Sequence, residues 1–200
     1  MIGILDYGVG NLKSIGNALH FLNLKHTLVA KPEDLDVCRA LILPGVGSFG
    51  YAVGQLQEKG LRVPLEDWLK SGRPLLGICL GLQLLMDSSQ ESPGAAGLGV
   101  FKGSCRKFSR GKVPHIGWNR LSLRRPDNLL AGIQDKEFFY FAHSYYPEPE
   151  TVEDQKVVAV SHYGREFAAV LREGRACGVQ FHPEKSGLAG LLVFKNWSVP

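Results

Sequence analysis

Cysteine is scarce in this sequence, and its spacing argues against the common structural uses of the residue. The four cysteines among 200 residues form neither a CxxC pair nor a compact disulfide framework, and no signal peptide precedes them; they are Cys38, Cys79, Cys105 and Cys177. We therefore expect a reducing, cytoplasmic compartment and no metal site.

Long apolar runs and a strong charge of one sign are also missing. No apolar run approaches the roughly 18 residues that a helix needs to cross a bilayer, so we expect no membrane partner. The net charge is only +4, and the positive charge of residues 102–112 is balanced by acidic residues at 148–154. Such runs are usually solvated faces, which argues against a nucleic-acid partner.

The apolar residues that are present, 44% of the chain, suffice for one core, and we predict a single domain over residues 1–200. Apolar runs predict strands at residues 2–5, 40–43, 74–78, 138–142, 167–171 and 176–181. Helical spacing marks residues 12–22, 64–70 and 80–86, and a final helix at 189–197. Because strands and helices alternate in the first half, we predict an α/β fold with a mostly parallel central sheet flanked by helices.

The second half is richer in strands, and it also contains two segments without a clear pattern. Antiparallel additions to the sheet are expected at residues 99–108, 120–123, 138–142 and 157–171. The segment 88–97, rich in Ser, Gly and Pro, and the segment 147–155 are predicted to be mobile.

The stretch GICLG at residues 77–81 is the first chemical signal. It follows a predicted strand and precedes a predicted helix, so Cys79 occupies the sharp turn that a nucleophile takes in α/β hydrolases. At a helix N-terminus the thiolate is favoured, and backbone N–H groups can bind an oxyanion. The alternative is a packed cysteine in a glycine-flanked turn.

A candidate base lies about a hundred residues later, in the stretch QFHPE. The imidazole side chain of His182 can accept and return a proton near neutral pH. Pro183 ends the strand at this point, and Glu184 can orient the ring. A purely structural role at a strand end is the alternative for this histidine. His143, at the end of another predicted strand, is kept as a second candidate.

The stretch PGVGSFG also fits a dinucleotide fingerprint through Gly45, Gly47 and Gly50. That interpretation needs an acid at the end of the next strand, whereas Glu66 and Asp67 lie inside a helical pattern. The same glycines suit a flexible loop that turns a peptide N–H toward the substrate of the cysteine, or a plain turn between strand and helix.

Taken together, these motifs resemble those of the class I glutamine amidotransferases, whose sheet is flavodoxin-like. Within that family the chain is most similar to the glutaminase subunits of imidazole glycerol phosphate synthase. The stretches that carry this resemblance are DYGVGNL at 6–12, PGVGSF at 44–49, PHIGWN at 114–119, FAHSYY at 141–146 and QFHPEKSG at 180–187.

The resemblance implies a role for each matching residue. Cys79 would attack the side-chain amide of glutamine, His182 would move protons, and Glu184 would steer His182. The oxyanion donors would come from the peptide joining Val46 and Gly47 and from the N–H of Leu80. Substrate-binding residues are expected to be Gln83, Glu91, Gly45, His143, Ser144 and Tyr145, although Glu91 could equally be a solvated loop acid and Tyr145 a core aromatic residue.

The resemblance also implies a partner and no cofactor. The expected partner is a cyclase subunit with a (β/α)₈ barrel, which would use the ammonia to make imidazole glycerol phosphate and aminoimidazole carboxamide ribotide. Lys185, Asn11 and Trp118 would lie at or near that interface, although Lys185 could equally be a solvated lysine and Trp118 a core aromatic residue. Three alternatives stay open: a glutaminase for anthranilate, aminodeoxychorismate or pyridoxal phosphate synthesis, a catalytically silent adaptor, and a cysteine peptidase or esterase.

Overall fold

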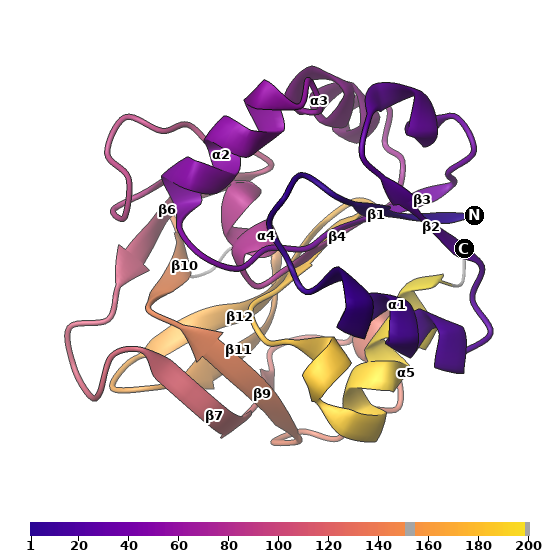
Figure 1. Cartoon of the computed structure of the whole chain (residues 1–200). Helices are drawn as coiled ribbons and strands as arrows, with labels where there is room; N and C mark the ends of the chain where they lie inside the picture. Colours follow the sequence, from indigo (N-terminus) through magenta and orange to yellow (C-terminus); the bar gives the residue numbers. More distant parts are fainter. Residues whose placement is uncertain (151–154, 199–200) are drawn as a thin grey trace.

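The computed structural model describes residues 1–150 and 155–198, and it is built around an eight-stranded sheet (Figure 1). The strand order is β2-β1-β3-β4-β13-β12-β11-β8, with parallel pairing from β2 to β13 and antiparallel pairing beyond. The strands are β1 Ile2–Leu5, β2 His26–Val29, β3 Ala40–Leu43, β4 Leu75–Ile78, β8 Ser122–Leu123, β11 Val157–His162, β12 Glu166–Glu173 and β13 Ala176–Val179.

Both faces of this sheet are covered, which explains why its central strands are apolar throughout. In β3, Ile42 packs into the cluster on one face, whereas Leu41 and Leu43 pack into the cluster on the other. Helices α1 (Leu12–Phe21) and α5 (Gly187–Ser198) cover the first face; α2 (Phe49–Glu58) and α3 (Arg62–Lys70) cover the second (Figure 1).

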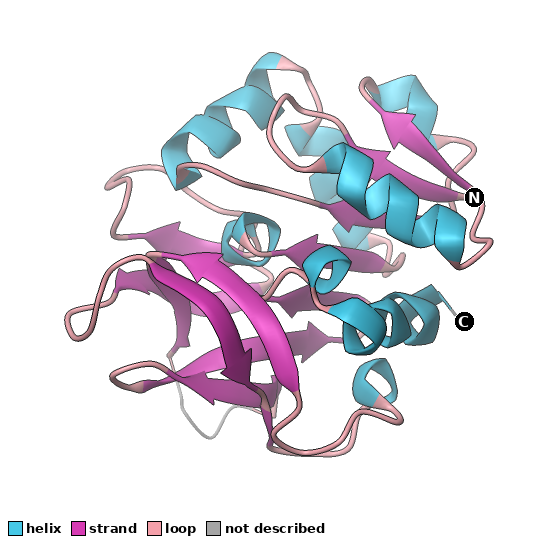
Figure 2. Cartoon of the chain, turned by 60° about the horizontal axis from the view of Figure 1, so that its bottom comes forward, coloured by secondary structure: helices cyan, strands magenta, loops and turns pink. Residues whose placement is uncertain are grey.

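Two smaller sheets flank the carboxyl end of the central one (Figure 2). The first has the order β10-β6-β5, and the second pairs β7 with β9 antiparallel. Their bounds are β5 Met86–Ser89, β6 Phe101–Lys107, β7 His115–Arg120, β9 Phe138–His143 and β10 Tyr145–Pro149. Short 3-10 helices lie at Pro32–Leu35 (η1), Asn128–Leu130 (η2) and Pro183–Lys185 (η3). Across residues 1–150 and 155–198, every helix is too short or too polar to span a bilayer.

The predicted α/β class and the mostly parallel arrangement of the first strands are confirmed, and β1 and β3 have the predicted bounds. The predicted helix at residues 80–86 is confirmed over residues 80–84 but wrong at its last two residues, because α4 (Leu80–Leu84) ends early and Met86 begins β5. The carbonyls that would continue the helix are taken by the returning chain: Leu98 N–H donates to Leu84 O at 2.7 Å, and Phe101 N–H to Leu85 O at 3.0 Å.

Several other observed element boundaries differ from the predicted ones. The predicted strand at 120–123 is divided between the end of β7 and β8, and the run 157–171 is a hairpin of β11 and β12. Residues 88–89 belong to β5 rather than to a loop, and Arg62 donates to the carbonyls of Ala96 and Gly97. Residues 145–149 form β10, and residues 151–154 of the predicted mobile segment lie outside the described residues. The sequence patterns do not predict β2, α2, β5 and β10, nor β7 before Arg120.

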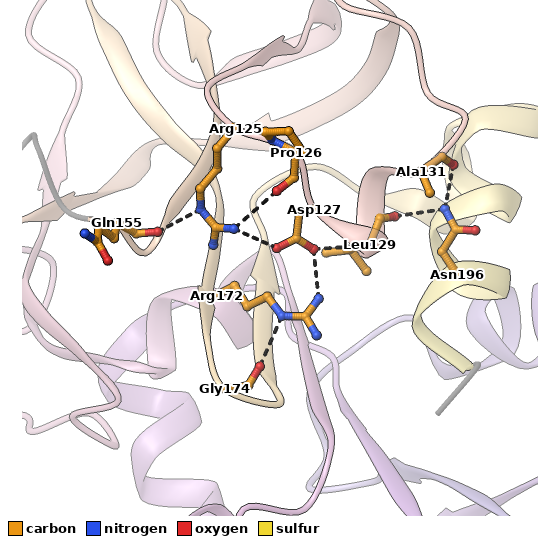
Figure 3. A network of polar contacts seen from close by, with 9 residues as sticks. All are labelled: Arg125, Pro126, Asp127, Leu129, Ala131, Gln155, Arg172, Gly174 and Asn196. Carbon is orange, nitrogen blue, oxygen red and sulfur yellow. Dashed lines mark hydrogen bonds and ion pairs between the residues drawn. The ribbon is translucent and has the colours of Figure 1, made fainter.

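The connection between β8 and β9 is anchored by one buried carboxylate, that of Asp127 (Figure 3). Its Oδ1 accepts from Arg172 Nη1 at 2.8 Å and from the backbone N–H of Leu129 at 2.9 Å, and its Oδ2 accepts from Arg125 Nη1 at 3.2 Å. Asn196 of α5 donates to two carbonyls of the same connection. The network therefore joins η2, β12 and α5.

We predict that Asp127→Ala lowers the free energy of unfolding by about 2 kcal/mol, because two arginines lose a hydrogen-bonded partner. The penalty stays moderate since Arg125 and Arg172 remain 36% and 31% exposed and can be rehydrated. Urea unfolding followed by circular dichroism measures the change. Asp67→Ala is the control, since Asp67 is 67% exposed and pairs only at the surface with Lys70. Equal stabilities of the two variants would contradict the assignment.

Candidate active site

Cys79 lies at the turn between β4 and α4, as the sequence predicts, in a backbone conformation that non-glycine residues rarely adopt. Its φ is 55° and its ψ is −107°, which costs on the order of 1–3 kcal/mol and is typical of functional sites. The flanking glycines allow the turn to approach the sheet: a Cβ on Gly81 would lie 1.8 Å from Leu43 O, and one on Gly77 would lie 2.7 Å from Gly81.

His182 reaches this turn because β13 lies beside β4. The two strands are parallel and in register, with Ile78 opposite Val179, so the residues after both strands leave the sheet at the same edge. There the His182 ring lies close enough to the Cys79 side chain for the two groups to interact. On the other side, His182 Nδ1 lies 2.8 Å from Glu184 Oε1. The predicted nucleophile, base and orienting carboxylate are therefore in contact.

The surroundings of His182 favour a charged imidazolium. Burial by itself lowers the pKa of His182, but the negative charge and hydrogen bond of a Cys79 thiolate, together with the bonded Glu184 carboxylate, raise it to about 10. The Glu184 side chain is only 1% exposed, so its charge is poorly screened. His182 is therefore favoured in its protonated form near pH 7, between Cys79 and Glu184.

A cavity of about 200 Å³ opens beside the sulfur. Its lining includes nine of the residues predicted for the site, namely Val46, Gly47, Cys79, Leu80, Gln83, Glu91, His143, Ser144 and Tyr145, and also Ile116. Gly45 lies just behind it, where a Cβ would come within 2.8 Å of Leu80 and 3.0 Å of the Tyr7 hydroxyl. That hydroxyl donates to Pro44 O, so Tyr7 supports the start of the loop.

Gln83 contributes to this cavity, but its amide nitrogen already has two acceptors. Gln83 Nε2 donates to Tyr145 O at 2.8 Å and to Gln180 Oε1 at 3.1 Å. Gln180 in turn donates from Nε2 to Cys79 Sγ at 3.6 Å. Sequence reasoning missed Gln180, although its place two residues before His182 was the available signal.

Glu91 lies at the cavity and also caps α2. Its Oε2 accepts from the N–H of Phe49 at 2.7 Å, and Ser92 Oγ accepts from the N–H of Gly50 at 2.9 Å. The Ser48 side chain at the N-cap makes no such bond. The segment carrying Glu91 therefore anchors the helix that follows the Gly45 to Gly47 loop, and a contact with substrate stays a prediction.

His143 is not equivalent to His182. Burial lowers the pKa of His143 to about 3, although its bond to the Tyr145 carbonyl works in the other direction. Its neighbour His115, 3.2 Å away between ring nitrogens, also has its pKa lowered by burial, to about 4. Both rings are therefore neutral near pH 7, and His143 supports the wall of the cavity.

The three predicted interface residues lie on different elements. Asn11 caps α1 by accepting from the Ser14 N–H at 3.4 Å. Trp118 of β7 is 57% exposed and contacts the ring of Tyr140, and Lys185 Nζ lies 5.6 Å from the centre of that ring. Trp118 and Lys185 thus share one surface.

Neither a dinucleotide site nor a second reactive site is supported by the part of the chain that the structure describes. Glu66, which a dinucleotide site would need at a strand end, lies within α3 and pairs with Arg62. A larger cavity of about 860 Å³ lies among β10, β6, β11 and β12, and it is lined by none of the three residues Cys79, His182 and Glu184. Several of its charged groups pair with one another, as Arg106 does with Glu148 and Arg124 with Glu166.

Comparisons with known proteins agree with this geometry. The family model "Glutamine amidotransferase class-I" matches residues 3–196. A protein of Methanothermobacter thermautotrophicus named imidazole glycerol phosphate synthase subunit HisH is 47% identical over 198 residues, covering 98% of this chain and 97% of that protein. A protein of the same name from Geobacillus kaustophilus is 45% identical over 204 residues, covering 98% and 95%.

Solved structures show the same fold at lower identity. A crystal structure described as glutamine amidotransferase has a TM-score of 0.75 and 22% identity, with 99% of both chains covered. The structure of PurLQS from Thermotoga maritima has a TM-score of 0.76 and 21% identity, covering 98% of this chain and 96% of that one. The family match over nearly the whole chain and the two relatives above 40% identity lead to one conclusion: this chain is a member of the class-I glutamine amidotransferases.

Proposed function

We propose that this chain is the glutaminase subunit of an imidazole glycerol phosphate synthase, and that it supplies ammonia to a cyclase subunit in histidine biosynthesis. The observation that carries the proposal is the contact of Cys79, His182 and Glu184 beside a small cavity, in a chain 47% identical to a protein of that name. The same contact, with the cysteine and its partners intact, argues against a silent adaptor.

The first half of the reaction uses the thiolate and the imidazolium together. The Cys79 sulfur attacks the side-chain carbonyl carbon of glutamine, and the carbonyl oxygen becomes a tetrahedral oxyanion. The N–H groups of Leu80 and of the Val46 to Gly47 peptide are the proposed donors to that oxyanion. When the intermediate collapses, the carbon–nitrogen bond breaks, His182 gives its proton to the leaving nitrogen, and ammonia departs.

The second half restores the starting charges. His182, now neutral, takes a proton from a water molecule that attacks the glutamyl thioester. The carbon–sulfur bond breaks, glutamate leaves, and Cys79 and His182 return to the thiolate and imidazolium. Glu184 accepts from Nδ1 of the ring, so that Nε2 can exchange the proton.

The size of the cavity supports a small substrate. Sites for drug-sized ligands usually occupy about 300–1,000 Å³, whereas this one has about 200 Å³. One amino acid fits that space better than a peptide does, which disfavours the peptidase alternative. The carboxylate of Glu91 at the cavity suits the ammonium group of such an amino acid.

The proposed partner surface is the exposed face of the sheet formed by β7 and β9. Ile116, Trp118 and Phe138 are 63%, 57% and 45% exposed there. Such a cluster of exposed apolar side chains is typical of a protein–protein interface. The surface adjoins the site directly: Ile116 also lines the cavity, and His182 N–H donates to Tyr140 O of β9 at 2.8 Å. Ammonia released at Cys79 would therefore be produced close to the partner.

We predict that Cys79→Ala, reconstituted with the cyclase subunit, loses glutamine-dependent cyclisation by at least about 10³-fold because no thioester can form. Ammonium-dependent cyclisation should persist at the wild-type rate. The measurement is product formation from the nucleotide substrate with glutamine or an ammonium salt as nitrogen donor. Cys38→Ala is the control, since Cys38 is buried far from the cavity on the α2 side of the sheet and should keep both activities. Retained use of glutamine by Cys79→Ala would refute the mechanism. Replacing the cyclase with acceptor subunits of the other pathways in a coupled assay tests the alternative glutaminases.

We also predict that Trp118→Asp raises the Kd for the cyclase subunit by about thirtyfold or more, as expected for a central aromatic residue at an interface. Isothermal titration calorimetry of the two subunits measures this. Val63→Asp is the matched control, because Val63 is 64% exposed on α3, on the opposite side of the sheet from β9. Equal effects of both substitutions would mean that the face of β7 and β9 is not the interface.

A further inference from the structure

Gln180 is a fully buried polar side chain that the mechanism above does not use. Its side chain is 0% exposed, it follows β13 immediately, and its Nε2 lies 3.6 Å from Cys79 Sγ. The residue is absent from the lining of the substrate cavity, so it approaches the sulfur from within the protein. A buried amide in contact with a nucleophile affects that nucleophile directly.

The orientation of this amide follows from a backbone carbonyl that can only accept. Gln83 must present Nε2, not Oε1, to Tyr145 O, from which it lies 2.8 Å away. The second hydrogen on Gln83 Nε2 is then directed at Gln180 Oε1, at 3.1 Å. Gln180 therefore accepts on the side of Gln83 and has its N–H donors left for the sulfur of Cys79.

The same carbonyl is held in place by a second chain of hydrogen bonds. His143 Nδ1 lies 2.8 Å from Tyr145 O and must carry its hydrogen there, so His143 Nε2 accepts from His115 Nδ1 at 3.2 Å. The amide of Asn119 is oriented in turn, because its Oδ1 accepts from the N–H of Arg120 and its Nδ2 therefore faces His115. With both lone pairs of Tyr145 O occupied, Gln83 and Gln180 have one favourable arrangement.

The two neighbours of the sulfur favour different protonation states. A thiol can donate to Ala142 O, which lies 3.8 Å from Sγ, whereas a thiolate is repelled by that oxygen. The N–H of Gln180 has the opposite preference, since a donor bonds more strongly to a charged acceptor. Gln180 thus offsets the carbonyl of Ala142 when the sulfur is ionised.

We propose that Gln180 is a positioning residue for the reaction: its fixed amide donates to the Cys79 sulfur, stabilises the thiolate and keeps it turned away from Ala142 O. This inference rests on the proposed role of Cys79 as the nucleophile. The imidazolium of His182 remains the main partner of the thiolate, and Gln180 supplies a second, neutral donor from the interior.

The test is the pH dependence of alkylation at Cys79 by iodoacetamide, followed by peptide mass spectrometry in the complex with the cyclase subunit. Gln180→Leu removes the donor, and Gln180→Glu keeps the shape but brings a carboxylate to the sulfur. The pH midpoint of alkylation should rise by about one unit in Gln180→Leu and further in Gln180→Glu. Glutaminase kcat should fall about tenfold with the KM for glutamine within twofold of wild type, because Gln180 does not reach the cavity.

Gln57→Leu is the control, since Gln57 is exposed on α2 and should leave the midpoint and kcat unchanged. Circular dichroism verifies that each variant is folded, and if Gln180→Leu is not, the Gln180→Glu variant decides alone. Unshifted midpoints in the folded variants would overturn the role of Gln180. Failure of the proposed function gives a different result: the wild-type complex would be alkylated at Cys79 but would not hydrolyse glutamine.

Discussion

The site depends on one structural constraint, the parallel pairing of β4 with β13. These strands come from positions about a hundred residues apart, yet Ile78 lies opposite Val179 in the sheet. Their carboxyl ends therefore coincide, and the turn with Cys79 meets the turn with Gln180 and His182. A shift of this register by one residue would also turn every side chain of β13 to the other face of the sheet. Because both faces are packed, the core itself keeps the nucleophile and its base together.

This constraint has an electrostatic consequence. The pairing brings Cys79, His182 and Glu184 together in a buried place, where an isolated charge would be very costly. Glu184 Oε1 is bonded to His182, while its Oε2 is buried without a hydrogen-bond partner among the described residues. A protonated His182 offsets the charge of this buried carboxylate. The same ring therefore stabilises the buried pair and is placed for the proposed chemistry.

Sequence patterns predicted the parts of this arrangement that local physics controls. Buried parallel strands are apolar at every position, so β1 and β3 were recognised with their correct bounds. In contrast, β2 (His26–Val29) is a half-exposed edge strand and α2 begins inside a glycine-rich stretch, so neither has a strong pattern. The end of α4 was missed because it depends on Leu98 and Phe101, which return from a distant turn to bond its last carbonyls.

The same distinction separates the predicted and unpredicted parts of the site. Spacing placed Gln83 on the helical face of Cys79, and it does line the cavity, but spacing could not show that its amide is occupied by Tyr145 and Gln180. Those partners are 62 and 97 positions away, and their roles follow from a carbonyl that accepts but cannot donate. Residue type tells which groups can form such a bond, whereas the folded chain decides which groups are left to form it. A nucleophile can therefore be recognised from its turn, but the donors that surround it are determined by the sheet that brings distant turns together.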